Sequence, residues 1–340
     1  MAPLATVGIL SIGEMGMGIA KLLIAHNFHV VTNIEGRSED THARARKSNI
    51  ETLPTDISLV EKADYILSIV PPRDALTIAT RITTAFNAAQ GKQTPLYYLD
   101  LNAVSPRTAR EIAALFQSSA PAIRFIDGGI IGLPPSPTSS SDPSPSSNPS
   151  STNITWRQPS IPVSGPHRLN SAAGTPGALE LAQTLKLNHI SDEIGPASGL
   201  KCSFSSLTKG FTALCLQAFT TASNMGVLPL LLQEAEMRAP GLLKAARVYV
   251  PDMPPKAYRW VREMQELAIT HADEGGFEGG AGPGEGVFGQ IANVYRSVAE
   301  ETVLGEEKTE RRKRGTSLED VASAMGEGLQ SKRRKVEEGR

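Results

Sequence analysis

The first two hundred residues alternate between short apolar runs and amphipathic stretches. The helical patterns begin after Gly13 and cover Asp40–Ser48, Arg73–Ala89, Arg107–Gln117 and about Pro176 to Leu185. The apolar runs are Val7–Ile12, Phe28–Ile34, Ala63–Val70, Pro95–Leu101, Phe125–Ile131 and Ser160–Ser164. Runs of this length between helices are typical of buried parallel strands. The pattern predicts an α/β domain over residues 1–195, with a Rossmann-like, doubly wound parallel sheet.

The second half of the chain carries helical patterns without strand signals. They run from Gly199 to about Arg238, with a break near Gly226 and Pro229, and then cover Lys256–His271 and Phe288–Leu304. This predicts an all-α domain over residues 196–304, with Gly275–Gly289 as a flexible connection. The polar residues 305–340 are expected to be a disordered tail.

One segment interrupts the first domain. Residues 133–153 are almost entirely Ser, Pro and Asn, a composition that cannot bury enough apolar surface to fold. The strand at Ser160–Ser164 follows it, so we expect a disordered insert within the domain rather than its end.

Composition restricts the classes of function. A chain of 340 residues with 40% hydrophobic content suffices for two domains, and its net charge of −1 gives no bulk attraction to nucleic acid. No apolar run could span a bilayer, and no signal peptide or metal-ligand spacing is evident. Cys202 and Cys215 lie too far apart along one helix to bond, which favours a reducing, cytoplasmic compartment. The basic clusters Arg311–Arg314 and Lys332–Lys335 leave nuclear import as an alternative.

The stretch Val7–Leu23 carries the main chemical signal. A buried strand leads into a glycine turn and then into a helix, in the pattern S-x-G-x-x-G. Gly13 lets a backbone approach a pyrophosphate, and Gly16 lets the helix pack on the strand, so the helix N-terminus can hold the phosphates. Ser11 stands where the dinucleotide fingerprint has its first glycine. A glycine-rich helix start without a ligand is the alternative.

The segment after the second strand bears on the choice of cofactor. It reads Glu35-Gly36-Arg37-Ser38. An acidic residue here would bind the ribose of NAD, whereas an arginine would hold the 2′-phosphate of NADP. Arg37 and Ser38 together offer a charge and a hydroxyl to an anion, so NADP is favoured, with NAD and a solvated loop as alternatives.

A lysine follows a run of small residues where the long helix begins. The run is Gly195-Pro196-Ala197-Ser198-Gly199-Leu200-Lys201. Lys201 is a candidate general acid/base for hydride transfer at a hydroxyl carbon, and Lys209 is the rival candidate. A solvated lysine is the alternative for each.

From about Thr6 to Ala299 the chain resembles the β-hydroxyacid dehydrogenases, the group of 6-phosphogluconate and 3-hydroxyisobutyrate dehydrogenases. Its second half resembles the branch with a phosphogluconate-dehydrogenase-like NAD-binding C-terminal domain. Five segments carry this resemblance. Gly8–Gly16 resembles the family pattern G-x-x-G-x-G-x-M-G, Ser68–Pro71 resembles S-x-V-P, and Asp100–Ser105 resembles D-x-S-T. Asp127–Gly132 resembles D-x-P-V-S-G-G, and Gly195–Lys201 resembles G-x-G-x-x-x-K.

The resemblance implies a role for each matching residue. Lys201 would be the general acid/base. Substrate would be bound by Asn102, Gly128, Gly129 and Ser205. The cofactor would be bound by Ser11, Ile12, Gly13, Glu14, Met15, Gly16, Arg37, Ser38, Val70, Pro71 and Asn102. The departures are Ser11, Ala197 and Ser205, which replace two glycines and an asparagine of the family.

These observations favour an NADP-dependent oxidoreductase acting on a small hydroxy acid or keto acid. The C-terminal domain is too small for a 6-phosphogluconate dehydrogenase, and Arg259 and Arg262 could anchor a substrate carboxylate. An imine reductase and a catalytically inactive, dinucleotide-binding scaffold protein are the alternatives. The family's second domain usually pairs with its copy, so we expect a homodimer that uses the apolar stretch Val227–Leu232.

Overall fold

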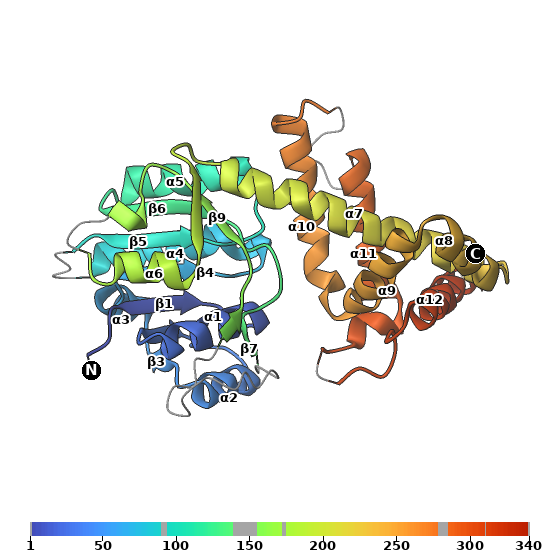
Figure 1. Ribbon diagram of the computed structural model, residues 1–340, viewed down its shortest axis with the longest axis horizontal. Helices are drawn as coiled ribbons and strands as arrows, with labels where there is room; N and C mark the ends of the chain where they lie inside the picture. Colours follow the sequence, from blue (N-terminus) through green and yellow to red (C-terminus); the bar gives the residue numbers. More distant parts are fainter. Residues whose placement is uncertain are drawn as a thin grey trace, which may run out of the picture. The chain divides into compact units, whose positions relative to one another are not determined.

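The computed structural model describes residues 2–89, 94–138, 155–171, 175–277, 285–309 and 311–338 (Figure 1). The chain divides into two compact units, Met1–Lys201 and Cys202–Arg340. The first unit is α/β and the second is helical, which confirms the predicted fold class. Among the described residues no helix is long and apolar enough to cross a membrane.

An eight-stranded sheet, counted over the described residues, forms the centre of the first unit. Its order is β10-β9-β6-β5-β4-β1-β2-β3. The strands are β1 (Thr6–Leu10), β2 (His29–Asn33), β3 (Glu51–Leu53), β4 (Tyr65–Ser68), β5 (Leu96–Asp100), β6 (Ile123–Gly128), β9 (Ile161–Ser164) and β10 (Leu187–Ser191). β1 lies between β2 and β4, so the chain order reverses at its carboxyl end, where ligands bind in open α/β sheets.

One part of the sheet departs from the predicted parallel arrangement. Neighbouring strands are parallel along the series β3-β2-β1-β4-β5-β6, and β9 is parallel to β10. The pair of β6 and β9 is antiparallel. A parallel neighbour requires a long crossover, usually a helix. The connection from β6 to β9 instead carries the hairpin of β7 (Ser136–Thr138) and β8 (Thr155–Arg157). Part of the predicted disordered insert is therefore a strand, and its residues 139–153 lie outside the described part of the chain.

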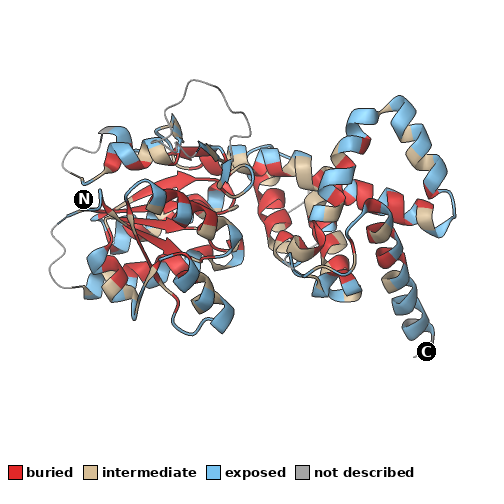
Figure 2. Ribbon diagram, turned by 60° about the horizontal axis from the view of Figure 1, so that its bottom comes forward, coloured by how far each residue is buried: buried red, intermediate tan, exposed pale blue. Residues whose placement is uncertain are grey.

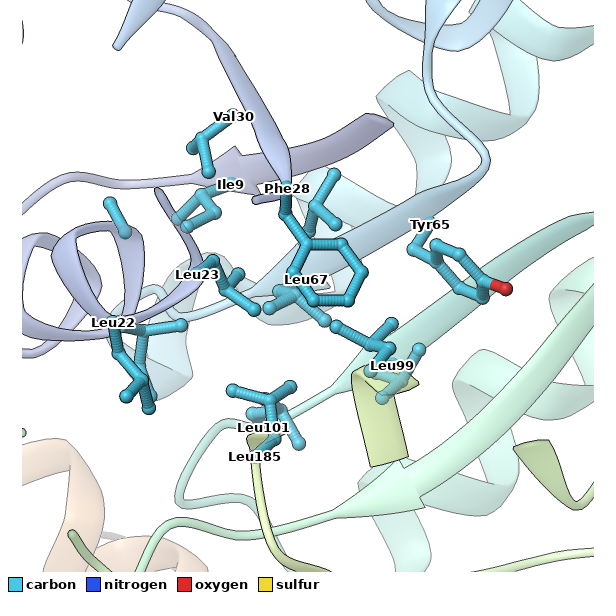
Figure 3. Close-up of a cluster of buried hydrophobic side chains, with 14 of the residues drawn as sticks. Ile9, Leu22, Leu23, Phe28, Val30, Tyr65, Leu67, Leu99, Leu101 and Leu185 are labelled. Carbon is cyan, nitrogen blue, oxygen red and sulfur yellow. The ribbon is translucent and has the colours of Figure 1, made fainter. Parts of the chain in front are cut away.

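Helices cover both faces of the sheet. They are α1 (Glu14–Ala25), α2 (Glu39–Lys47), α3 (Asp56–Lys62), α4 (Ala75–Ala88), α5 (Pro106–Ser119) and α6 (Ala178–Thr184), with 3-10 turns η1 (Pro72–Asp74) and η2 (Leu169–Ser171). α1 and α6 pack with one apolar cluster, part of which is shown in Figure 3, and α3, α4 and α5 pack with another. Tyr97 and Leu99 belong to the first cluster and Tyr98 to the second. This alternation along a strand buried on both faces explains why the strands are continuous apolar runs.

Six helices account for most of the described residues of the second half. They are α7 (Pro196–Asn224), α8 (Leu228–Arg238), α9 (Pro240–Asp252), α10 (Ala257–Asp273), α11 (Gly286–Glu301) and α12 (Leu318–Glu338), with 3-10 turns η3 (Pro254–Lys256) and η4 (Val303–Glu306). In the core of the second unit, Trp260 meets Tyr295 edge to face, with ring centroids 5.1 Å apart. Cys202 and Cys215 are both buried and unbonded, as expected. Residues 278–284 of the glycine-rich connection lie outside the described residues.

The expectation of a disordered tail is wrong for α12. Leu318, Val321 and Met325 are buried, at the spacing of one helix face. Figure 2 shows the helix beside the C-terminus buried near its start and exposed toward its end. In the first basic cluster, Arg314 lies 2.8 Å from Asp320 and 3.2 Å from Glu327. The tail therefore contains an amphipathic helix whose apolar face belongs to the core of the second unit, and Arg314 pairs with two carboxylates of that helix.

Candidate functional site

The glycine turn forms as predicted between β1 and α1. Ile12 is buried in the core and fixes the turn, while Gly13 is exposed and is the N-cap residue just before α1. Gly13, the N-cap residue of this helix, has no side chain to cap it, so the first backbone N–H groups of α1 point away from the helix without a cap from that residue. Such groups, at the positive end of a helix of twelve residues, can hold an anion.

The turn residues differ in how tightly they are enclosed. A Cβ on Gly16 would clash with the carbonyl oxygen of Ser11, so only glycine lets α1 pack this closely on the turn. A Cβ on Gly13 would meet nothing within 4 Å, so the helix start faces open space. Ser11 adopts a φ of 72°, a left-handed conformation that costs a non-glycine residue about 1 kcal/mol. The family glycine is thus missing at a position that favours glycine.

The loop after β2 presents Arg37 and Ser38 to solvent. Arg37 makes no ion pair with any described residue, and its backbone N–H closes a turn onto the carbonyl of Ile34 at 3.0 Å. Ser38 begins α2 without capping it, and its hydroxyl lies 3.2 Å from that of Thr41. A charge, a hydroxyl and a helix start are therefore close together in the chain. Glu35, the residue that would favour NAD, is exposed in the same loop.

Asn102 joins the ends of two neighbouring strands. Its side-chain oxygen accepts the backbone N–H of Val70 at 2.7 Å, and its side-chain nitrogen donates to the Ser68 hydroxyl at 3.0 Å. The residue is 3% exposed. Asn102 therefore fixes the turn at Val70 and Pro71 against the end of β5, and its predicted contact with cofactor or substrate remains a prediction.

The segment leaving β6 passes beside Lys201. Lys201 lies in the second turn of α7, and its Nζ donates to the carbonyl of Ile130 at 2.6 Å. A Cβ on Gly129 would lie 2.7 Å from the Cβ of Lys201, so glycine is required for this approach. Gly128 is buried against Leu101. The structure thus brings Gly129 and Lys201 together, with the lysine amine held at a backbone carbonyl.

Ser205 and Lys209, which follow Lys201 in α7, are largely buried. Ser205 is 2% exposed, one turn beyond Lys201. The Lys209 ammonium forms an ion pair with Glu263 and lies 5.1 Å from the centre of the Trp260 ring. These contacts give Lys209 a structural role within the second unit.

Arg262 and Arg259, the proposed carboxylate anchors, lie on α10 of the second unit. Arg262 lies 2.6 Å from the carboxylate of Glu266, a fully buried residue four positions further on. This ion pair already neutralises the Arg262 guanidinium. Arg259 is half-buried and forms no ion pair with the described residues, and its role as a carboxylate anchor stays a prediction.

Comparisons with known proteins agree with this architecture. Residues 6–92 match a family model described as "NADP oxidoreductase coenzyme F420-dependent", and residues 222–298 match a "domain of unknown function (DUF1932)". An uncharacterized 28.5 kDa protein of Methanothermus fervidus is 24% identical over 232 residues, covering 68% of this chain and 76% of that protein.

Two solved structures have the same fold over nearly the whole chain. The 3-hydroxyisobutyrate dehydrogenase of Mycobacterium tuberculosis, determined with L-serine, has a TM-score of 0.60 at 14% identity and covers 96% of this chain and 98% of its own. The 3-hydroxyisobutyrate dehydrogenase of Salmonella typhimurium has a TM-score of 0.59 at 14% identity, and the match covers 94% of this chain and 99% of that enzyme.

Residues 6–92 of the first unit thus match a model of an NADP-binding oxidoreductase domain, which confirms the prediction of an NADP or NAD cofactor. The predicted resemblance is confirmed as well: the chain combines this domain with a helical second unit in the fold of the 3-hydroxyisobutyrate dehydrogenases.

Proposed function

We propose that this protein is an NADP-dependent oxidoreductase that transfers a hydride between the nicotinamide and a small hydroxy acid or its keto acid. The observation that carries the proposal is the Lys201 amine, held 2.6 Å from the Ile130 carbonyl oxygen in the unit that contains the glycine turn. Hydride transfer at a hydroxyl carbon requires a group that exchanges the hydroxyl proton, and a positioned amine can do this.

The residues of the first unit fit a dinucleotide. The uncapped start of α1 and the open space at Gly13 accommodate a pyrophosphate, and Gly16 sets the close packing that the turn needs. When bound, the nicotinamide ring supplies or accepts the hydride. Lys201 binds the substrate oxygen and moves the proton at its Nζ, while the Ile130 carbonyl orients that amine.

The loop after β2 supports NADP as the preferred cofactor. Arg37 is exposed and makes no ion pair with the described residues, so its guanidinium is available to a 2′-phosphate. In α2, by contrast, the exposed Arg46 lies 2.5 Å from the Glu39 carboxylate. Arg46 therefore serves as a matched control, an arginine close by in the chain that is already paired.

Fluorescence titrations with NADPH and NADH test the cofactor proposal. We expect wild type and Arg46→Ala to bind NADPH more tightly than NADH, and Arg37→Ala to lose that preference. Equal binding of the two cofactors by wild type would contradict the role of Arg37. Binding without turnover across a broad panel of hydroxy acids, keto acids and imines would instead favour a scaffold protein.

The second unit supports a homodimer. α8 has a single buried residue, Leu228, whereas Leu230 and Met237 are each 62% exposed. In α9, Leu242 is 60% exposed. Exposed apolar side chains on successive helices are typical of an interface. A light-scattering mass of one chain would contradict this part of the proposal.

A further inference from the structure

A buried carboxylate holds the start of α7. Asp127, near the end of β6, is fully buried, and its Oδ2 accepts the backbone N–H groups of Gly195 at 3.0 Å and Ser198 at 3.2 Å. The same oxygen accepts the Ser164 hydroxyl at 2.8 Å, and Oδ1 accepts the Ser198 hydroxyl. Asp127 therefore caps a helix that lies about seventy residues further along the chain.

Ser164 completes this capping arrangement. It lies opposite Asp127 in the antiparallel pair of β6 and β9, and its hydroxyl accepts the backbone N–H of Ala197 at 3.1 Å. Pro196, between the capped residues, has no N–H to satisfy. The backbone donors of residues 195–198 are therefore all accounted for, by two side chains from two neighbouring strands.

The environment of Asp127 makes this contact costly to lose. Burial raises the pKa of its carboxyl, while the four donors and the helix start favour the charged form. Removing the carboxylate would leave buried N–H groups without acceptors, which is more costly than losing a solvent-exposed cap.

The same strand exit also contacts Lys201. Asp127 binds the first turn of α7, Gly129 lies against the Lys201 side chain, and the Ile130 carbonyl accepts its ammonium. Ser198 and Lys201 are three residues apart, so they share one face of the helix. The residues from Asp127 to Ile130 thus contact α7 at three successive points.

We infer that Asp127 is a positioning residue for Lys201: together with Ser164 and Ser198 it fixes the start of α7 so that the lysine amine meets the Ile130 carbonyl. The role in catalysis rests on the proposed function, but the placement of the amine does not. Asp127 acts through the helix it caps, and it exchanges no proton with substrate.

Competitive labelling of lysine amines with trace acetic anhydride, read by peptide mass spectrometry across a pH series, tests this placement without a substrate. The exposed Lys21 serves as internal reference. The variants are Asp127→Asn, which keeps the size but loses the charge, and Ser198→Ala, which loses one hydroxyl. Thr55→Ala is the control, because it deletes the cap of α3 and touches no part of this cluster.

We expect the reactivity of Lys201 relative to Lys21 to rise about tenfold in Asp127→Asn. This is the factor for losing one charge-assisted hydrogen bond, here the bond from the Lys201 ammonium to the Ile130 carbonyl. The pH midpoint of Lys201 labelling should shift as well. Ser198→Ala should change the reactivity ratio and this midpoint in the same direction as Asp127→Asn, whereas Thr55→Ala should change neither. An unchanged ratio in Ser198→Ala, or an equal rise at all lysines, would overturn the inference. If Asp127→Asn does not fold, Ser198→Ala decides. A wild type that binds no NADPH would refute the proposed function and leave this result valid.

Discussion

Replacing Gly129 with alanine should displace the Lys201 amine. The new Cβ would lie 2.7 Å from the Cβ of Lys201 and 3.0 Å from its Cγ, and the lysine Cβ is part of the helix rather than a flexible end. Relief of the overlap to an ordinary contact requires a shift of roughly 0.7 Å. Overpacking of this kind costs about 1–3 kcal/mol.

A shift of this size also affects the proposed chemistry. Misplacement of a catalytic group by 1 Å can lower a rate by about a hundredfold, so we expect turnover by Gly129→Ala to fall at least about tenfold with NADPH affinity unchanged. Gly199→Ala is the control in the same helix, since its nearest neighbour is the Pro106 Cγ at 3.5 Å and alanine favours a helix interior by about 1 kcal/mol.

Thermal unfolding measures the loss of stability, NADPH oxidation with an accepted substrate measures the loss of turnover, and an NADPH titration checks that affinity is unchanged. Gly129→Ala should lower the melting temperature by about 2–12 °C, while Gly199→Ala should leave it unchanged or raise it. A Gly129→Ala protein with wild-type stability and turnover would refute the close packing of Gly129 on Lys201.

Three further predictions follow from single residues. Ser11→Gly should stabilise the protein by up to about 1 kcal/mol in urea unfolding, because it relieves the left-handed φ of 72°; a loss of stability would argue against that conformation. Burial raises the pKa of the Cys215 thiol to about 11, so its contribution to stability should be complete below pH 9 and lost as the pH rises through 11. Reaction of Cys215 with a thiol reagent at pH 8 before unfolding would contradict its burial. Leu318→Ala should cost about 2–5 kcal/mol, whereas a disordered tail would show no change in the urea midpoint.

The sequence predicted the elements whose signal is local and strong. Strands buried on both faces are continuous apolar runs, so β1, β4 and β5 could be recognised. β3 has no buried residue, β10 alternates between half-buried and exposed positions, and α9 contains Pro251, so each lacks such a signal. The sequence shows only a short amphipathic stretch between two basic clusters, which indicates a polar tail, whereas the structure buries Leu318, Val321 and Met325 on one face of α12.

In the candidate site, features that are contiguous in the sequence can be predicted, whereas contacts between distant residues cannot. The glycine turn and the small residues before Lys201 are contiguous in the sequence, so local pattern identifies them. The pairing of Lys209 with Glu263 joins residues 54 positions apart, and the cap of α7 by Asp127 joins residues about seventy positions apart. Such contacts depend on how the elements pack, so pattern alone could not distinguish the candidate base from the structural lysine.

In the proposed NADPH-dependent reduction Lys201 carries the proton, and Lys201→Met tests this role most directly. Oxidation of NADPH should be followed for wild type and variant over a panel of small keto acids. We predict that both proteins bind NADPH equally and that the variant turns over the accepted substrate about 10²–10⁴-fold more slowly, the usual contribution of a general acid/base. Equal turnover by the two proteins would contradict the account.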